Sequence, residues 1–204
     1  MKINKDARNL ILYMTFGDGY IQKNGSFLKI RHCIQQKEYL EWKHRLLKEN
    51  GISVSDIYYV NNNGYGAYEF YTHSYDFIKA IRKYLYTPKK NIAQIKQLKK
   101  FTPLGLFIWY LDDGGLSQLK NKDGYIRGNN LILNTMLSKE SNQIIIDYFN
   151  EYWNIRFRQS KNHGKYRLEC GTKEARKFIN ILKPFIPQVP CMGYKFNVKP
   201  EPTT

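Results

Sequence analysis

The sequence predicts an α+β fold in which one order of elements, helix, strand, strand, helix, strand, strand, helix, occurs twice. Three observations support this prediction: two apolar segments of helical length end in Asp-Gly, strand-like segments follow each of them, and the whole order returns further along the chain. The final aspartates of the apolar segments are Asp18 and Asp113, so the copies are offset by 113 − 18 = 95 residues. The repeat predicts a pseudo-twofold protein whose two first helices meet at the axis.

The first copy opens with the apolar run NLILYMTFGDGYI, followed by the polar turn KNGS. Apolar residues at helical spacing then predict a second helix, with Gly51 as its C-terminal stop. An Asn/Gly-rich tip between two strand-like runs predicts a hairpin before the last helix. In chain order we expect a helix within 9–21, a strand over 27–35, a helix over 37–51, a hairpin over 56–73 and a helix over 74–86.

The second copy opens with GLFIWYLDDGGL and continues with the turn-rich LKNKDGY and the strand-like IRGNNLILNT. Ser138 is placed to cap the next helix, because a serine side chain accepts hydrogen bonds from the free N–H groups of a first turn. We expect a helix within 105–116, a turn over 119–125, a strand from 126, a helix over 138–154, a hairpin over 155–172 and a helix over 173–186.

A connector separates the two copies. The segment TPKKNIAQIKQLKKFTP is rich in lysine and bracketed by prolines, a composition typical of a linker. We therefore predict an N-terminal subdomain over 1–86, a basic linker over 87–103 and a C-terminal subdomain over 104–204.

The charge balance indicates an anionic partner. Lys and Arg number 33 against 17 Asp and Glu, a formal net charge of +16 that is spread through nearly every segment. A whole basic surface suits nucleic acid. No apolar run is long enough to span a membrane, so we expect no membrane partner, and the N-terminus lacks a signal-peptide core, so we expect no secretion. The Lys/Ile/Asn/Tyr-rich composition fits an AT-rich genome, either an organelle (mitochondrion or chloroplast) or the cytoplasm of a bacterium or its phage.

Cysteine and histidine argue against two other kinds of site. The three cysteines, Cys33, Cys170 and Cys191, are odd in number and lack CxxC spacing, so we expect buried, reduced thiols. The four histidines are scattered without metal-ligand spacing, which argues against a histidine-metal nuclease.

The paired aspartates indicate a metal site. A carboxylate at a helix C-terminus meets the negative end of the helix dipole, and two such carboxylates brought together by pseudo-symmetry repel each other. A cation relieves both effects. Mg²⁺ suits this position, because it takes hard oxygen ligands and keeps places for water and phosphate oxygens.

The two Asp-Gly strings resemble the paired signature helices of the LAGLIDADG homing endonucleases, and WYLDDGG is similar to the monomeric, two-motif group of that family. The resemblance in layout covers residues from about 8 to about 198. It implies two curved antiparallel sheets that form a DNA-binding saddle. It also implies a monomer that cuts both strands of a long, asymmetric site in double-stranded DNA and promotes intron mobility.

The resemblance assigns roles residue by residue. The metal-binding acids fall on Asp18 and Asp113, with Gly17 and Asp112 as their neighbours in the metal site, and Asp112 is not expected to be a ligand. Mg²⁺ is the expected cofactor, and Mn²⁺ is expected to substitute for it. A catalytic lysine near each metal is expected at Lys90 in PKKNI and at Lys195 in GYKFN.

Polar residues of the strands are the candidate DNA contacts, because the major groove presents a distinct pattern of donors and acceptors for each base pair. In FLKIRHCIQ, alternation predicts Lys29, Arg31 and Cys33 on one face and Leu28, Ile30 and His32 on the other. The predicted DNA-binding residues are Gln22, Lys23, Lys29, Arg31, Gln35, Tyr58, Asn61, Asn63, Gln118, Lys120, Arg127, Asn129, Arg156, Arg158, Lys161 and Arg167.

Two other functions compete with cleavage. An RNA maturase would keep the basic face and bind its host group I intron RNA to assist splicing. A DNA-binding regulator derived from this fold would have lost an acid. Both Asp18 and Asp113 are present, which favours the endonuclease.

Overall fold

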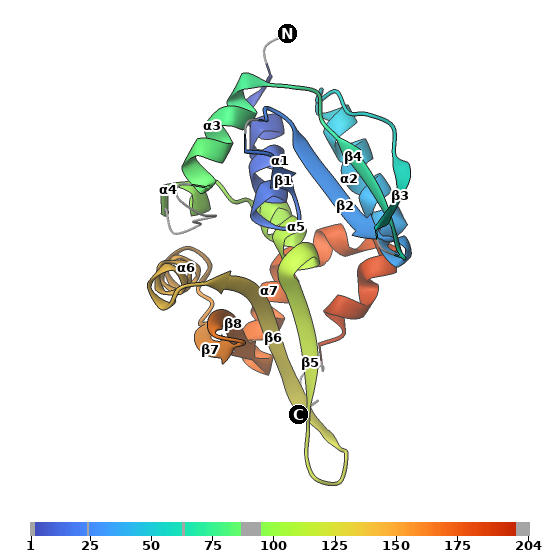
Figure 1. Cartoon of the computed structure of the whole chain (residues 1–204). Helices are drawn as coiled ribbons and strands as arrows, with labels where there is room; N and C mark the ends of the chain where they lie inside the picture. Colours follow the sequence, from blue (N-terminus) through green and yellow to red (C-terminus); the bar gives the residue numbers. More distant parts are fainter. Residues whose placement is uncertain (1–2, 24, 63, 87–94, 199–204) are drawn as a thin grey trace. The chain divides into compact units, whose positions relative to one another are not determined.

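The computed structural model describes residues 3–23, 25–62, 64–86 and 95–198. The chain divides into two compact units, one of Met1–Asn91 with Pro187–Met192 and one of Ile92–Ile186 with Gly193–Thr204. Each unit has the same order of helices and strands (Figure 1), which confirms the predicted α+β class and its duplication. The subdomain and linker boundaries at 86 and 104 stay predictions.

The first unit holds a four-stranded antiparallel sheet in the order β1-β2-β4-β3. Gly51 follows helix α2 with a φ of +76°, a left-handed conformation that glycine adopts without strain, so the predicted helix stop is confirmed. The elements are α1 (Lys5–Phe16), β1 (Tyr20–Ile21), β2 (Leu28–Cys33), the 3-10 turn η1 (Ile34–Gln36), α2 (Lys37–Glu49), β3 (Tyr58–Asn62), β4 (Tyr65–Tyr71) and α3 (Asp76–Leu85).

The second unit holds a sheet of equivalent connectivity, in the order β5-β6-β8-β7. The elements are α4 (Ile95–Leu98), α5 (Pro103–Asp113), β5 (Gly114–Lys120), β6 (Ile126–Leu137), α6 (Lys139–Trp153), β7 (Arg158–Asn162), β8 (Lys165–Gly171), α7 (Thr172–Leu182) and the 3-10 helices η2 (Lys183–Gln188) and η3 (Pro190–Phe196).

Three boundaries in this unit differ from the prediction. Helix α4 lies within the segment predicted to be a linker. Strand β5 continues to Lys120, into the predicted turn, because it pairs with β6 as far as Ile126. Helix α7 ends at Leu182 and not at 186, since Pro184 cannot donate a helical hydrogen bond.

Helices cover one face of each sheet and leave the other face polar. In the first unit α1 and α2 pack on β2, and the predicted alternation of β2 is confirmed: Leu28 and Ile30 are fully buried, while Arg31 and Cys33 are exposed. In the second unit α6 and α7 contact β6 and β8. Figure 1 shows α2 running along the sheet in the first unit.

Helices α1, α5 and α6 begin at side-chain caps. Asn4, Thr102 and Ser138 each accept a hydrogen bond from the backbone N–H three residues later, at 2.7, 3.3 and 3.2 Å. The predicted cap at Ser138 is thereby confirmed. Each cap contributes about 1 kcal/mol to stability, because it satisfies an N–H that the helix itself leaves without a partner.

Helices α1 and α5 are buried on every side over most of their length. All residues from Leu10 to Phe16 and from Gly105 to Leu111 are buried. A helix that is apolar all round belongs inside a protein core, which explains why both segments lack the polar stripe of a surface helix. Among the helices of the described residues, none combines the length and the apolar character that crossing a membrane requires.

The cysteines do not share one environment. Cys170 is buried, and burial raises the pKa of its thiol to about 12. Cys191 is partly exposed and Cys33 is exposed. The expectation of buried thiols is therefore wrong for Cys33, because this residue occupies the polar face of β2.

Candidate active site and nucleic-acid interface

The first Asp-Gly sequence lies in the turn that follows α1. The helix ends at Phe16, and the N–H of Gly19 donates to the carbonyl of Met14 at 2.8 Å, so the chain folds back over the last helical turn. Asp18 lies inside this turn and its side chain is 42% exposed. Asp18 lies two residues beyond Phe16, next to the helix end where the sequence placed it. Gly17 is the buried C-cap of α1.

The second Asp-Gly sequence is arranged differently. Asp112 and Asp113 are the last residues of α5, and Gly114 starts β5. The Trp109 Nε1–H donates to Asp113 Oδ2 at 3.1 Å, and the Asn134 side chain donates to the Asp113 backbone carbonyl at 3.2 Å. Asp113 is thus held by the indole one helical turn earlier. Asp112 and Asp113 are both half-buried.

Close packing requires the glycine after each aspartate. A Cβ on Gly19 would lie 2.5 Å from the Met14 carbonyl oxygen, and a Cβ on Gly114 would overlap both the ring and the carbonyl of Tyr110. Gly114 has an extended backbone, with φ −85° and ψ 156°. Space, and not a left-handed conformation, therefore dictates glycine at these positions.

Lys195 is anchored at the end of α5. It is 8% exposed, and its Nζ donates to the carbonyls of Leu111 and Gly114 at 2.6 and 2.8 Å. The Tyr110 hydroxyl donates to the Lys195 carbonyl at 2.7 Å, and burial raises the pKa of this hydroxyl. A lysine in this position satisfies the Leu111 carbonyl, which the last turn of the helix leaves free, and opposes the negative end of the helix dipole. Lys90, the other predicted lysine, lies outside the described residues.

A buried lysine that sequence reasoning missed lies near Asp18. Lys43 of α2 is 0% exposed and its Nζ lies 3.1 Å from His32 Nε2. On the other edge of the imidazole, Nδ1 lies 3.2 Å from Gln36 Oε1 and 3.7 Å from Asp18 Oδ2. An ammonium group only donates, so a protonated Lys43 would leave Nε2 as the acceptor and place the imidazole proton on Nδ1, facing these oxygens. The signal in the sequence was the position of Lys43 on the apolar stripe of α2, between Leu40 and Leu47.

The polar face of the first sheet is organised around Glu69, which was also missed. Its carboxylate accepts from Arg31 Nε at 2.6 Å and from the Tyr58 hydroxyl at 2.5 Å, and Lys29 Nζ lies 2.8 Å away. Burial alone would raise the pKa of this carboxyl, but the hydrogen bonds from Lys29, Tyr58 and Arg31 outweigh it and hold the pKa below its ordinary value. Three predicted DNA contacts therefore share one acid.

Glu169 has the same place in the second sheet. Its carboxylate accepts from Asn130 Nδ2 at 2.6 Å, with Arg158 Nε at 3.6 Å and an Arg167 guanidinium nitrogen at 4.0 Å. Burial again opposes ionisation, and Asn130, Ser160 and the two arginines outweigh it, so the pKa of Glu169 is lowered. The arginines are two of the predicted DNA contacts.

The other predicted DNA contacts lie in strands, hairpin tips and connecting segments. Asn129 is 1% exposed, so it is not the open strand residue that was expected, and its backbone N–H and carbonyl both bond the Thr172 hydroxyl. Asn61 accepts from the Gly64 N–H at 3.0 Å and shapes a hairpin tip. Asn63 lies outside the described residues. The exposed members are Gln22, Lys23, Gln35, Asn61, Gln118, Lys120, Arg127, Arg156 and Lys161.

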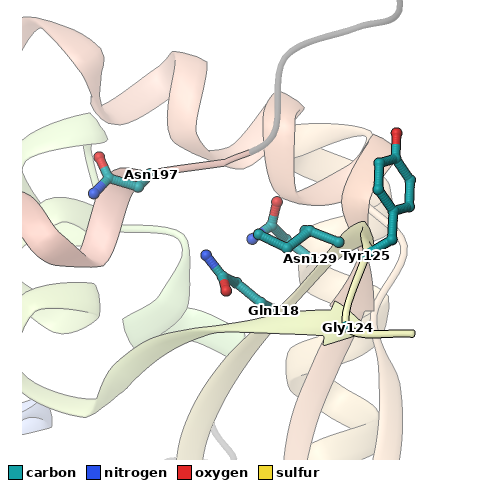
Figure 2. A pocket seen from close by; sticks show the side chains of 6 residues that line it. Gln118, Gly124, Tyr125, Asn129 and Asn197 are labelled. Atoms are coloured by element: carbon teal, nitrogen blue, oxygen red, sulfur yellow. The ribbon is translucent and has the colours of Figure 1, made fainter. Parts of the chain in front are cut away.

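A hollow of about 450 Å³ lies beside the β5–β6 hairpin. Figure 2 shows the side chains of Gln118, Asn129 and Asn197 gathered at this hollow, with Tyr125 at the hairpin end. The exposed carboxamides of Gln118 and Asn197 offer both donors and acceptors, the groups that hydrogen-bond base edges.

The sequence of this chain matches a known family. The model of the LAGLIDADG DNA endonuclease family aligns with residues 9–178. The chain belongs to this family. The LAGLIDADG match includes Asp18, Asp113 and all strands of both sheets, whereas Lys195 lies beyond it.

Two curated relatives align with nearly the whole length of this LAGLIDADG chain. "Probable intron-encoded endonuclease 1" of Wickerhamomyces canadensis is 26% identical over 211 residues, which cover 96% of this chain and 87% of that protein. Protein RecA of Mycolicibacterium flavescens is 28% identical over 206 residues, which cover 95% of this chain and 47% of RecA. The chain thus spans about half the length, or less, of the RecA proteins that it matches.

Two solved structures share the fold. The homing endonuclease I-WcaI, bound to its DNA recognition sequence, aligns with a TM-score of 0.78 at 22% identity, over 98% of this chain and 89% of that one. A variant of I-DmoI, in complex with its target DNA in the presence of magnesium, aligns with a TM-score of 0.52 at 13% identity, over 88% of this chain and 98% of that one. The LAGLIDADG fold is common to all three.

The close approach at Gly114 can be tested by adding one methyl group. We expect Gly114→Ala to lower the free energy of unfolding by about 1–3 kcal/mol, because the Cβ overlaps Tyr110. Denaturant unfolding measures the change. The matched control is Gly115→Ala, where a Cβ would meet nothing within 4 Å and the change should stay under about 0.5 kcal/mol. Equal losses in both variants would show that space at Gly114 is not the constraint.

The anchoring of Lys195 predicts a structural cost when its charge is removed. Lys195→Met leaves the Leu111 and Gly114 carbonyls without this donor, so we expect a loss of about 1–3 kcal/mol in thermal or urea unfolding. Lys183→Met, at an exposed position in η2, is the control and should unfold like the wild type. Wild-type stability of the Lys195 variant would contradict the assigned role.

Proposed function

We propose that this protein is a site-specific endonuclease that hydrolyses phosphodiester bonds on both strands of a long, asymmetric DNA site. The observation that carries the proposal is the repeated arrangement of a buried helix, an aspartate and a tightly packed glycine in each unit of a LAGLIDADG endonuclease chain. Two strands need two cleavage events, and one chain supplies two such aspartates. We therefore also propose that it acts as a monomer.

Magnesium is the proposed cofactor, with manganese as a substitute. The donor chemistry fits, because Asp18 and Asp113 offer carboxylate oxygens, which are hard ligands of the kind that Mg²⁺ prefers. A bound divalent ion would stabilise charge on the scissile phosphate and lower the pKa of the attacking water. The I-DmoI complex with magnesium present supports this choice for a protein of the same fold.

Neighbouring side chains fix the positions of these two aspartates. The Trp109 indole fixes one Asp113 oxygen. Lys195 secures the backbone on both sides of Asp113 through the carbonyls of Leu111 and Gly114. His32 faces Asp18 from the core of the first unit. We retain Lys195 and Lys90 as the proposed catalytic lysines, and Gly17 and Asp112 as the proposed neighbours of the metal ligands.

Double-stranded DNA is the proposed substrate and the polar sheet faces are the proposed contacts. The net charge of +16 supplies the attraction that phosphates require. The I-WcaI complex with its recognition sequence supports the proposal through a shared fold. The named relative from Wickerhamomyces canadensis is described as intron-encoded, which supports a role in intron mobility.

Neutralising either aspartate should abolish double-strand cleavage. We expect Asp18→Asn and Asp113→Asn each to lower cleavage of a duplex carrying the uninterrupted insertion site by at least about a hundredfold, since each removes a metal-binding charge. Binding to the same duplex should change less than about threefold, because neither acid attracts phosphate. Asp147→Asn, exposed on α6, controls for the loss of one negative charge. Full cleavage by either active-site variant would refute the assignment.

Metal removal separates cleavage from binding. The wild type should cut the duplex with Mg²⁺ or Mn²⁺ and should stop cutting in EDTA, while gel-shift binding persists. If the wild type never cuts but binds the structured host intron RNA tightly, the maturase function replaces this proposal.

A further inference from the structure

Each sheet carries a buried glutamate on the face proposed to meet DNA. Glu69 of β4 is 3% exposed and Glu169 of β8 is 8% exposed. Basic residues outnumber acids by 33 to 17, and a carboxylate facing phosphates works against binding. Burying an ion is also costly unless it is paired. Both acids are paired with neighbouring donors, which explains how the fold accommodates a buried carboxylate. The pairing does not explain why a carboxylate occupies this face.

The two acids occupy equivalent places in the duplicated fold. Each belongs to the third strand in the order of its sheet, with a hydrogen-bonded strand on either side. Glu69 is in register with Arg31 on one side and Tyr58 on the other. Glu169 is in register with Ile132 and Arg158 at the corresponding positions. The carboxylate is therefore common to both units, whereas its partners differ.

The partners are the cations that are proposed to contact DNA. Arg31 gives Glu69 two contacts of 2.6 Å, through Nε and a terminal nitrogen, and Lys29 lies at 2.8 Å. Burial and the neighbouring Glu69 raise the pKa of the Tyr58 hydroxyl, so this group stays a donor to the acid at neutral pH. In the second unit Arg158 and Arg167 both contact Glu169, at the longer distances of 3.6 and 4.0 Å.

We propose that Glu69 and Glu169 are positioning residues that set the sequence selectivity of DNA binding. A cation paired with a carboxylate has little net charge left for phosphates, whose attraction is independent of sequence. Its remaining N–H groups are fixed in direction, which suits the directional hydrogen bonds of base edges. The carboxylate converts phosphate-binding cations into base-reading donors. This inference rests on the proposed DNA-binding function.

The test compares charge-removing variants of matched shape. Glu69→Gln and Glu169→Gln are assayed with Glu49→Gln and Glu151→Gln, which remove exposed acids from α2 and α6. Binding is measured in EDTA against the duplex that the wild type selects from a random library, and against a scrambled duplex. The salt dependence of each dissociation constant is recorded, because it counts the phosphate contacts.

We expect each positioning variant to bind the scrambled duplex more tightly and to lose roughly tenfold in its preference for the selected duplex. The slope of log Kd against log salt concentration should steepen by about one for each freed cation. The Glu49 and Glu151 controls should keep the wild-type preference and slope. Unchanged preference and slope in both positioning variants would overturn the inference. So would equal changes in the controls, since they would reflect net charge alone.

A second variant keeps the inference testable if a glutamate variant fails to fold. Arg31→Met should weaken binding to the selected duplex and leave the salt slope unchanged, because a charge tied to Glu69 does not neutralise a phosphate. Lys120→Met removes an exposed lysine and should lower the slope by about one. A slope lowered equally by both variants would contradict the proposal.

The wild type distinguishes this inference from the proposed function. If wild-type protein selects no sequence from the library and cuts no insertion site, the endonuclease proposal fails first. If it selects and cuts, and the glutamate variants select as well as it does, only the positioning role fails.

Discussion

The arrangement of each unit depends on how closely the chain passes over the last turn of its buried helix. At Gly19 and Gly114 the backbone comes so near to the residues of that turn that a Cβ cannot be accommodated. This approach sets where the first strand leaves the helix, and that strand pairs with the second strand of its sheet. It also holds the preceding aspartate, because a residue between a packed helix and a packed glycine has little conformational freedom.

The two units hold their aspartates through different contacts. Asp18 lies in a turn beyond α1 and is partly exposed, with a buried lysine and histidine behind it. Asp113 completes α5 and is held by an indole. The second helix end is further secured by Lys195, which arrives from η3 near the C-terminal end of the chain. The two units therefore place their acids in unlike surroundings.

The sequence predicted the features that local patterns control. Periodicity gave the order of helices and strands, the alternating faces of β2, the stop at Gly51 and the cap at Ser138, and the structure confirms them. The ends of β5 and α7 were less accurate, because strand pairing and a proline moved them.

Features that depend on distant pairing could not be predicted. Glu69 meets Arg31 across 38 residues of chain, and only strand register brings them together. Lys43 is a lysine on an apolar stripe, and its contact with His32 becomes evident only when α2 lies on β2. Asn129 bonds through its backbone to a threonine 43 residues away, and only the folded sheet reveals this contact.

The shared place of Glu69 and Glu169 bears on how such a protein diversifies. A glutamate in a central strand is surrounded by positions on both neighbouring strands, and those positions already hold different residues in the two units. Exchange of one neighbour leaves the acid and the backbone ladder intact. The repeated fold thus supplies two separate frames, within which the residues around each glutamate can change without rebuilding the sheet.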